Sequence, residues 1–234
     1  MIGRSAHPFP LRRSHPLIRR SLTTLSLLAL AAAPLAAQSA SDPTHKVEVG
    51  ALPAGWMGRT DHASDKLTDA KFVAMGSGYH VTSGPAAIYW NPKNVTSGPF
   101  TASTTVTQTK APMHPEAYGL FFAGSNLDKP DQSYAYFIVR GDGKFLVNHR
   151  AGDQVHKIIP WTENAAIVKA DANGKATNKL TVDATKADSI RFLVNDKQVA
   201  ALPVSQLGNG HGLVGLRVNH NLDVHVADLT IAKK

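Results

Sequence analysis

The chain has 234 residues, 43% of them hydrophobic and 18% charged, a composition that predicts a folded protein rather than a disordered one. It contains no cysteine, which excludes disulfides, thiolate metal sites, a cysteine nucleophile and a lipoprotein anchor. The formal net charge is +8, but five arginines precede the first acidic residue, Asp42, and the cations and anions past residue 37 number 20 and 17. The basic excess therefore lies in the N-terminal segment, and no nucleic-acid partner is predicted.

Residues 1–37 have the three-part pattern of a signal peptide. Residues 1–21 carry arginine pairs and no acid, residues 22–30 are apolar or hydroxyl-bearing, and residues 31–37 are mostly alanine. The apolar part is about 16 residues long, shorter than the roughly 20 that span a membrane. We expect cleavage near Ala37, with Ala40 as the alternative. The mature protein is then periplasmic or secreted and has no transmembrane segment, and the pair Arg19-Arg20 leaves both the general and the twin-arginine export routes open.

The mature chain is predicted to consist of a flexible lead-in, residues 38–46, and one all-β domain, residues 47–234. From Ser97 onward apolar and polar residues alternate with period two, and turn-forming residues recur about every 8 to 12 positions. Many short antiparallel strands favour a two-sheet jelly-roll sandwich. The expected strands are residues 100–107, 118–123, 133–140, 144–150, 180–182, 189–194, 198–204, 213–218 and 222–231.

The clearest turn signal is Gly141-Asp142-Gly143, which predicts a hairpin between residues 133–140 and 144–150. If Arg140 pairs with Lys144, side chains two positions apart along each strand share a face of the sheet. The predicted core face holds Ala135, Phe137, Val139, Phe145, Val147 and His149. The opposite, polar and aromatic face holds Tyr134, Tyr136, Ile138, Leu146, Asn148 and Arg150.

The polar and aromatic face is a candidate sugar-binding surface. A tyrosine ring can cover the apolar C–H side of a pyranose, while amide and guanidinium groups bond its hydroxyls. The candidate ligand-binding residues are Tyr134, Tyr136, Asn148, Arg150 and Arg217. The alternative is a solvated outer face on which these side chains only shield the sheet.

Four segments carry a resemblance to a known superfamily. They are residues 116–122 (EAYGLFF), 134–143 (YAYFIVRGDG), 193–199 (LVNDKQV) and 212–218 (GLVGLRV). Over roughly residues 70–232 the chain resembles the concanavalin A-like lectin/glucanase superfamily, in particular laminin-G-like and 3-keto-disaccharide hydrolase-like domains. The resemblance implies a curved antiparallel jelly roll whose concave face usually holds a glycan.

The superfamily's glucanase chemistry is not expected here. Retaining glucanases of this fold carry a Glu-x-Asp-x-x-Glu motif, because a nucleophile and an acid must lie about 5 Å apart. The mature chain lacks that motif, and its three glutamates, Glu48, Glu116 and Glu163, are isolated. A pair of Asp223 and Asp228 would need a bulge, since residues five apart on a regular strand lie on opposite faces.

Histidine offers a weaker catalytic hypothesis. Asp223 and His225 share a strand face, where the carboxylate can orient the imidazole as a general base or the two can hold a divalent cation. His114 lies between Met113 and Pro115 in a predicted rim loop, and such loops often carry function. The alternatives are a surface pair and an ordinary exposed loop. No metal site or cofactor is predicted, and calcium is left open.

The sequence therefore favours an exported glycan-handling protein that binds an oligosaccharide or polysaccharide on one sheet face. The resemblance implies an alternative, a glycoside hydrolase or lyase acting on a 3-keto disaccharide with a histidine base. A third possibility is a structural or interaction protein of the envelope without a small ligand. Trp56, Trp90 and Trp161 can stack on a sugar, although tryptophan more often packs in a core or at an edge.

Overall fold

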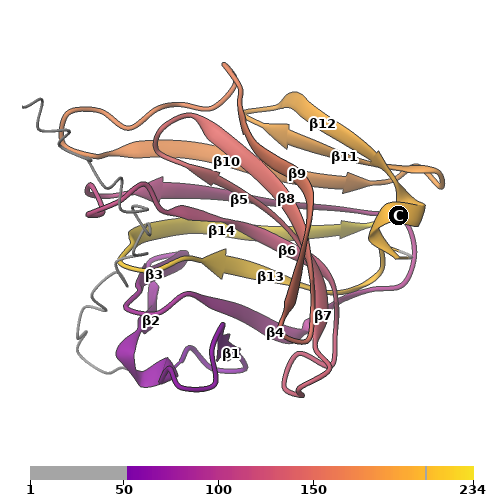
Figure 1. The fold of residues 1–234 in the computed structure, drawn as a ribbon, viewed down its shortest axis with the longest axis horizontal. Helices are drawn as coiled ribbons and strands as arrows, with labels where there is room; N and C mark the ends of the chain where they lie inside the picture. The colour runs from indigo at the N-terminus through magenta and orange to yellow at the C-terminus, as the bar shows by residue number, and fades with distance from the viewer. Residues whose placement is uncertain (1–51, 209) are drawn as a thin grey trace, which may run out of the picture. The chain divides into compact units, whose positions relative to one another are not determined.

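The computed structural model describes residues 52–208 and 210–234, whose strands form two antiparallel sheets of seven strands each (Figure 1). Sheet A consists, in spatial order, of β1 (Met57–Thr60), β4 (Ala87–Thr96), β13 (Gly212–Val218), β6 (Ala117–Ser125), β7 (Ser133–Arg140), β8 (Lys144–Ala151) and β9 (Gln154–Glu163). Sheet B consists of β12 (Lys197–Pro203), β11 (Ser189–Val194), β10 (Ala176–Ala184), β5 (Phe100–Gln108), β14 (Asp223–Lys233), β3 (Gly78–Thr82) and β2 (Lys71–Met75). Two short 3-10 helices, η1 (Leu67–Asp69) and η2 (Val204–Leu207), complete the described elements.

This arrangement confirms the predicted all-β, two-sheet jelly roll. The predicted signal peptide, residues 1–37, and the lead-in, residues 38–46, lie outside the described residues. Among the residues that the structure describes, no helix is long and apolar enough to cross a membrane.

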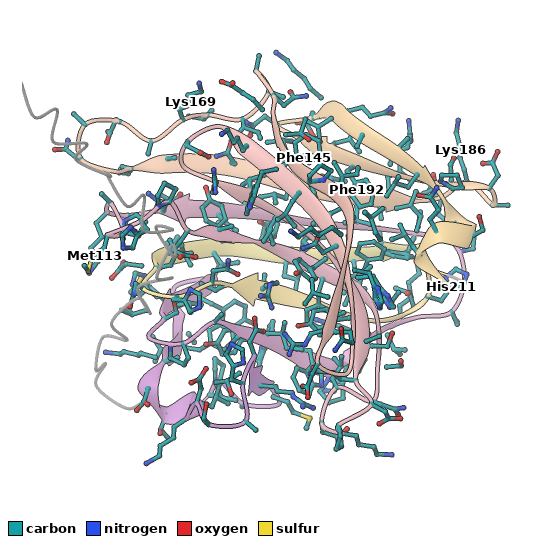
Figure 2. The ribbon with its side chains drawn as sticks, in the orientation of Figure 1. Met113, Phe145, Lys169, Lys186, Phe192 and His211 are labelled. Atoms are coloured by element: carbon teal, nitrogen blue, oxygen red, sulfur yellow. The ribbon has the colours of Figure 1, made fainter. Side chains whose placement is uncertain are left out.

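The main core lies between the two sheets and contains a cluster of phenylalanines. Phe192 of β11 packs on Phe122 of β6 and Phe137 of β7, with ring centroids 5.9 and 5.2 Å apart. Phe137 also meets Phe145 of β8 edge-on at 6.1 Å. All four side chains are buried, and Figure 2 shows Phe145 and Phe192 in the interior. The burial of large aromatic rings makes this contact a main source of cohesion between the sheets.

The predicted hairpin has the predicted register. Arg140 pairs with Lys144, Tyr136 with Asn148 and Tyr134 with Arg150 across β7 and β8. Gly143 supplies the positive φ of 88° that the loop needs. The Arg140 guanidinium donates to both oxygens of the Asp142 carboxylate, at 2.8 and 2.6 Å. This bidentate pair holds the turn residue Asp142 against the last residue of β7.

The strands before Ser97 and the later strand β9 were not predicted. In β4 the residues Ala87–Trp90 are all buried, so no polar position alternates with the apolar ones. In β9 nearly every residue is exposed or half-buried, and the strand runs through Pro160 at the edge of sheet A. Both patterns break the period-two signal on which a strand prediction depends.

The central strands of sheet A are buried on both faces. The inner face of the sheet belongs to the main core, and its outer face carries a second apolar cluster in which every member has at most 7% of its surface exposed. The cluster consists of Ile88, Trp90, Ala117, Phe121, Leu127, Tyr134, Tyr136, Ile138 and Leu146. The outer face of the hairpin is therefore not a solvated surface.

Candidate functional site

A carboxylate lies between two buried arginines on the outer face of sheet A. Arg217 of β13 donates from Nη1 and Nη2 to Oδ1 and Oδ2 of Asp61, at 2.9 and 2.7 Å. Arg150 of β8 donates from Nη2 to the Asp61 carbonyl at 2.8 Å, and its Nη1 lies 3.5 Å from Asp61 Oδ1. A bidentate pair of this geometry is among the stronger hydrogen-bonded contacts in proteins.

Asp61 closes the outer face because it comes from the opposite edge of the sheet. It directly follows β1, the edge strand, whereas β8 is the sixth strand in the spatial order. Arg59 of β1 makes a similar long-range contact. Its Nη1 donates to the backbone carbonyls of Leu127 and Lys129 in the β6–β7 loop. Sheet A therefore curves until its edge strand and β8 meet over the outer face.

The electrostatics of this cluster favour an ionised Asp61. Burial by itself would raise the pKa of Asp61, but the charges of Arg217 and Arg150 and the hydrogen bonds from Arg217 hold it below its ordinary value. The same pairing raises the pKa of Arg217 in spite of its burial. Asp153 is the other carboxylate near Arg150, but it is 94% exposed and 3.9 Å away. Two buried guanidinium groups thus share one carboxylate whose side chain is 15% exposed.

Tyr136 lies at the centre of the face between two polar side chains. Asn148 donates from Nδ2 to the Tyr136 hydroxyl at 3.0 Å, and the Arg217 guanidinium lies 4.6 Å from the centre of the Tyr136 ring. Asn148 Oδ1 and Arg217 Nε are buried and have no hydrogen-bond partner among the described residues. A buried acceptor and a buried donor are thus left over beside the same ring, a situation that is costly unless a further polar group binds there.

The five predicted ligand-binding residues come together in this one cluster. Tyr134, Tyr136, Asn148, Arg150 and Arg217 are 1–6% exposed. Tyr134 joins the network by accepting from Arg217 Nη1 at 3.2 Å, and burial is the main reason why its pKa is raised. Sequence reasoning missed Asp61, because nothing in the chain marks it as the partner of arginines 89 and 156 residues away.

The candidate pair of Asp223 and His225 lies on sheet B, away from this cluster. Asp223 binds His80, with 3.1 Å between Oδ1 and Nε2, and its Oδ2 lies 3.3 Å from Lys110 Nζ. Burial would raise the pKa of Asp223, but a hydrogen bond from Thr109 and the neighbouring His80 and Lys110 side chains lower it. His225 faces His80 across β14 and β3, with ring centroids 6.5 Å apart. The imidazole that Asp223 orients is therefore that of His80.

The bulge required for an Asp223–Asp228 pair exists, but the two carboxylates lie far apart. The register of β14 shifts between Val226 and Asp228. The Asp228 carboxylate accepts from the Thr105 backbone, and the Asp223 carboxylate accepts from the Thr109 hydroxyl, four residues further along the chain. That offset is about 13 Å on an extended strand, well beyond the roughly 5 Å of a retaining pair. Within residues 52–208 and 210–234, no three histidine, aspartate or glutamate side chains are grouped to hold a metal ion.

His114 lies in the β5–β6 loop beside a cavity of about 270 Å³, which Gln108, Asp142 and Gly174 also line. Figure 2 shows Met113, the residue before His114, projecting away from the strands. Of the tryptophans, Trp90 is 3% exposed and packs in the outer cluster. Trp161 of β9 is 37% exposed, and the Arg140 guanidinium lies 4.4 Å from its ring centre.

Comparison with known proteins gives structural but no sequence relatives. No protein-family model and no curated protein sequence match the chain. A Bacillus subtilis protein of unknown function with a galectin-like fold is 12% identical, over 75% of this chain and 88% of that one, with a TM-score of 0.53. A glycoside hydrolase family 16 endo-glucanase from Bacteroides ovatus is 8% identical, over 76% and 94%, with a TM-score of 0.52. The Bacillus licheniformis β-glucanase is 11% identical, over 80% and 96%, also with a TM-score of 0.52. With two antiparallel seven-stranded sheets and these structural neighbours, the chain has a concanavalin A-like jelly-roll fold.

Proposed function

We propose that this is an exported carbohydrate-binding protein whose ligand binds the outer face of sheet A beside Tyr136. The observation that carries the proposal is the pair of unpartnered buried atoms, Asn148 Oδ1 and Arg217 Nε, next to one aromatic ring. A sugar hydroxyl both donates and accepts, so one hydroxyl group can complement both atoms. The ring of Tyr136 is 5% exposed, so it forms the floor beneath these polar atoms rather than an open stacking surface.

The exposed rim of the face lies on the β9 side. Lys157 pairs in register with Asn148 and is exposed, and Trp161 presents more than a third of its surface to solvent. A ligand approaching from this side would meet Lys157 before it reached Asn148. The glucanases among the structural neighbours act on carbohydrates, which supports this class of ligand.

The geometry favours binding over hydrolysis. Asp61 is the carboxylate of the cluster, and both its oxygens accept from Arg217. Its lowered pKa keeps it ionised at neutral pH, so it has no proton to donate to a leaving group. Hydrolysis of a glycoside also needs a second carboxyl group a defined distance away.

Changing Asn148 to alanine is expected to weaken binding of the protein's glycan at least about tenfold, because a hydrogen bond to the ligand is lost. Glycan-array screening followed by calorimetry on the selected glycan would measure the change. The matched control is Asn178→Ala on β10, which removes a buried amide that donates to the Tyr118 hydroxyl at 3.3 Å in the main core. Tyr118→Phe is a milder control that removes only the hydroxyl. We expect both controls to lose stability and to keep the affinity. Equal affinity of wild type and Asn148→Ala would refute the proposed site.

Export is expected to remove the leader. Mass spectrometry of the protein recovered from the periplasm or the medium should give an N-terminus at Gln38 or, for the alternative cleavage, at Ser41. Replacing Leu27 and Leu28 with arginine interrupts the apolar run and should retain the uncut chain in the cytoplasm. Recovery of the intact wild-type chain from the cytoplasm alone would contradict the export proposal.

A further inference from the structure

A cleft is lined by residues of β4 in sheet A and of β3 and β14 in sheet B. Its volume is about 240 Å³. The side chains that line it combine aromatic rings with amides and a carboxylate. They include Trp56, Tyr79, Asn91, Asn94 and Asp228. None of these residues belongs to the Asp61 cluster.

The aromatic wall of the cleft is held rigidly by the main core. Trp56 and Tyr79 meet edge-on with ring centroids 4.9 Å apart, and Trp56 donates from Nε1 to the Tyr79 hydroxyl at 3.2 Å. Both rings also pack on Phe72, at 5.0 and 5.2 Å, and Phe72 is fully buried. Trp56 and Tyr79 themselves are only half-buried. A ligand therefore meets preorganised rings and loses little free energy in ordering them.

The polar side chains of the cleft keep unused hydrogen-bonding groups. Asn91 Oδ1 accepts from the Lys93 backbone at 3.0 Å, which leaves its Nδ2 as a donor. Asp228 Oδ1 accepts from the Thr105 backbone at 3.0 Å, and its Oδ2 has no hydrogen-bond partner in the part of the chain that the structure describes. The Asn94 amide likewise has no hydrogen-bond partner among these residues.

The charge of the cleft differs from that of the outer face of sheet A. Asp228 forms no ion pair with any described cation, so the cleft carries one uncompensated carboxylate. Such a carboxylate repels an anionic ligand and accepts well from hydroxyl groups. Amides that donate and accept, a carboxylate that accepts and a rigid aromatic wall together suit a polyhydroxylated ring without negative charge.

We propose that this cleft binds a single uncharged pyranose residue and is a second carbohydrate site, independent of the outer face of sheet A. Trp56 and Tyr79 cover part of the C–H surface of the sugar. Asn91 and Asn94 bond its hydroxyl oxygens and hydrogens, and Asp228 Oδ2 accepts from a hydroxyl.

The experiment uses the mature protein and a panel of methyl hexopyranosides, with methyl glucuronide as the acidic comparison. The readout is the indole N–H signal of Trp56, assigned by comparison with Trp56→Phe. Saturable movement of this signal is expected with at least one neutral glycoside and weaker binding with the glucuronide. Asn94→Ala and Asp228→Asn should each weaken binding of the neutral glycoside about tenfold. Asp228→Asn should also reduce the difference in affinity between the neutral glycoside and the glucuronide, because it removes the negative charge. The asparagine keeps an oxygen that can accept from the Thr105 backbone.

The controls separate this site from the proposed site at Tyr136. Asn173→Ala changes an exposed asparagine in the β9–β10 loop and should leave the affinity unchanged. Asn148→Ala should leave the Trp56 response intact, whether or not the outer face binds a glycan. No saturable shift with any glycoside up to about 100 mM, far above the millimolar range, would overturn the proposal. A Trp56 response that survives both Asn94→Ala and Asp228→Asn would overturn it as well.

Discussion

Replacing Asp61 with alanine is expected to lower the free energy of unfolding by about 3–5 kcal/mol, because it leaves two buried guanidinium groups without their shared carboxylate. Arg150 and Arg217 are each 5% exposed, so water cannot replace the lost partner without opening the face. The contact between Arg150 Nη1 and the Asp61 carboxylate is lost in the same step, while the hydrogen bond from Arg150 to the Asp61 backbone carbonyl can remain. Urea denaturation of the variant and the wild type would measure the loss.

Asp153→Ala is the matched control for this prediction. Asp153 also lies near Arg150, at 3.9 Å, but its side chain is 94% exposed. An exposed ion pair contributes little, so this variant should stay within about 0.5 kcal/mol of the wild type. Similar losses for Asp61→Ala and Asp153→Ala would show that the buried network does not stabilise the fold.

Low pH should destabilise the protein through protonation of Asp61. The folded-state pKa of Asp61 lies below its ordinary value of 3.8, so its stabilising contribution is complete above that value. The contribution declines as the pH falls through the lower folded-state pKa, where the carboxylate becomes protonated. Asp61→Asn lacks this proton equilibrium. We expect its stability to fall less than that of the wild type between pH 4 and pH 2, roughly the range in which such a carboxyl titrates.

The hairpin shows which part of the fold can be predicted from sequence. Its turn residues and its period-two pattern are local, and together they fix which residues pair across β7 and β8. Local patterns also predicted β5, β11 and β13 nearly to their observed bounds. They failed at Ala87–Trp90, because a strand that is buried on both faces shows no alternation.

The composition of the candidate site could be predicted, but its closure could not. Alternation along β7 and β8 placed Tyr136, Asn148 and Arg150 on one face, and that grouping is what the structure has. The burial of the face depends on the curvature of sheet A and on Asp61, which arrives from a strand that the sequence pattern did not reveal. Two arginines on an otherwise apolar sheet face are the available signal, since buried guanidinium groups require a carboxylate from somewhere in the chain.

Replacing Phe192 with alanine is expected to cost about 3–5 kcal/mol, because the ring bridges the two sheets and its removal leaves a cavity. Phe192 is fully buried on β11, while its ring contacts Phe122 and Phe137 belong to sheet A. The cost should exceed the loss of transfer free energy, since strands fixed in two hydrogen-bonded ladders cannot collapse into the gap. Thermal and urea unfolding would measure it.

Phe192→Leu distinguishes a packing effect from damage to β11. Leucine fills most of the space and keeps the strand apolar, so this variant should lose no more than about 1.5 kcal/mol. Both variants should keep the Trp56 and Tyr136 sites intact at temperatures where they remain folded, because none of the residues assigned to those sites lies on β11. Equal losses for alanine and leucine would mean that Phe192 acts through the shape of its ring contacts with Phe122 and Phe137 and not through the volume it fills.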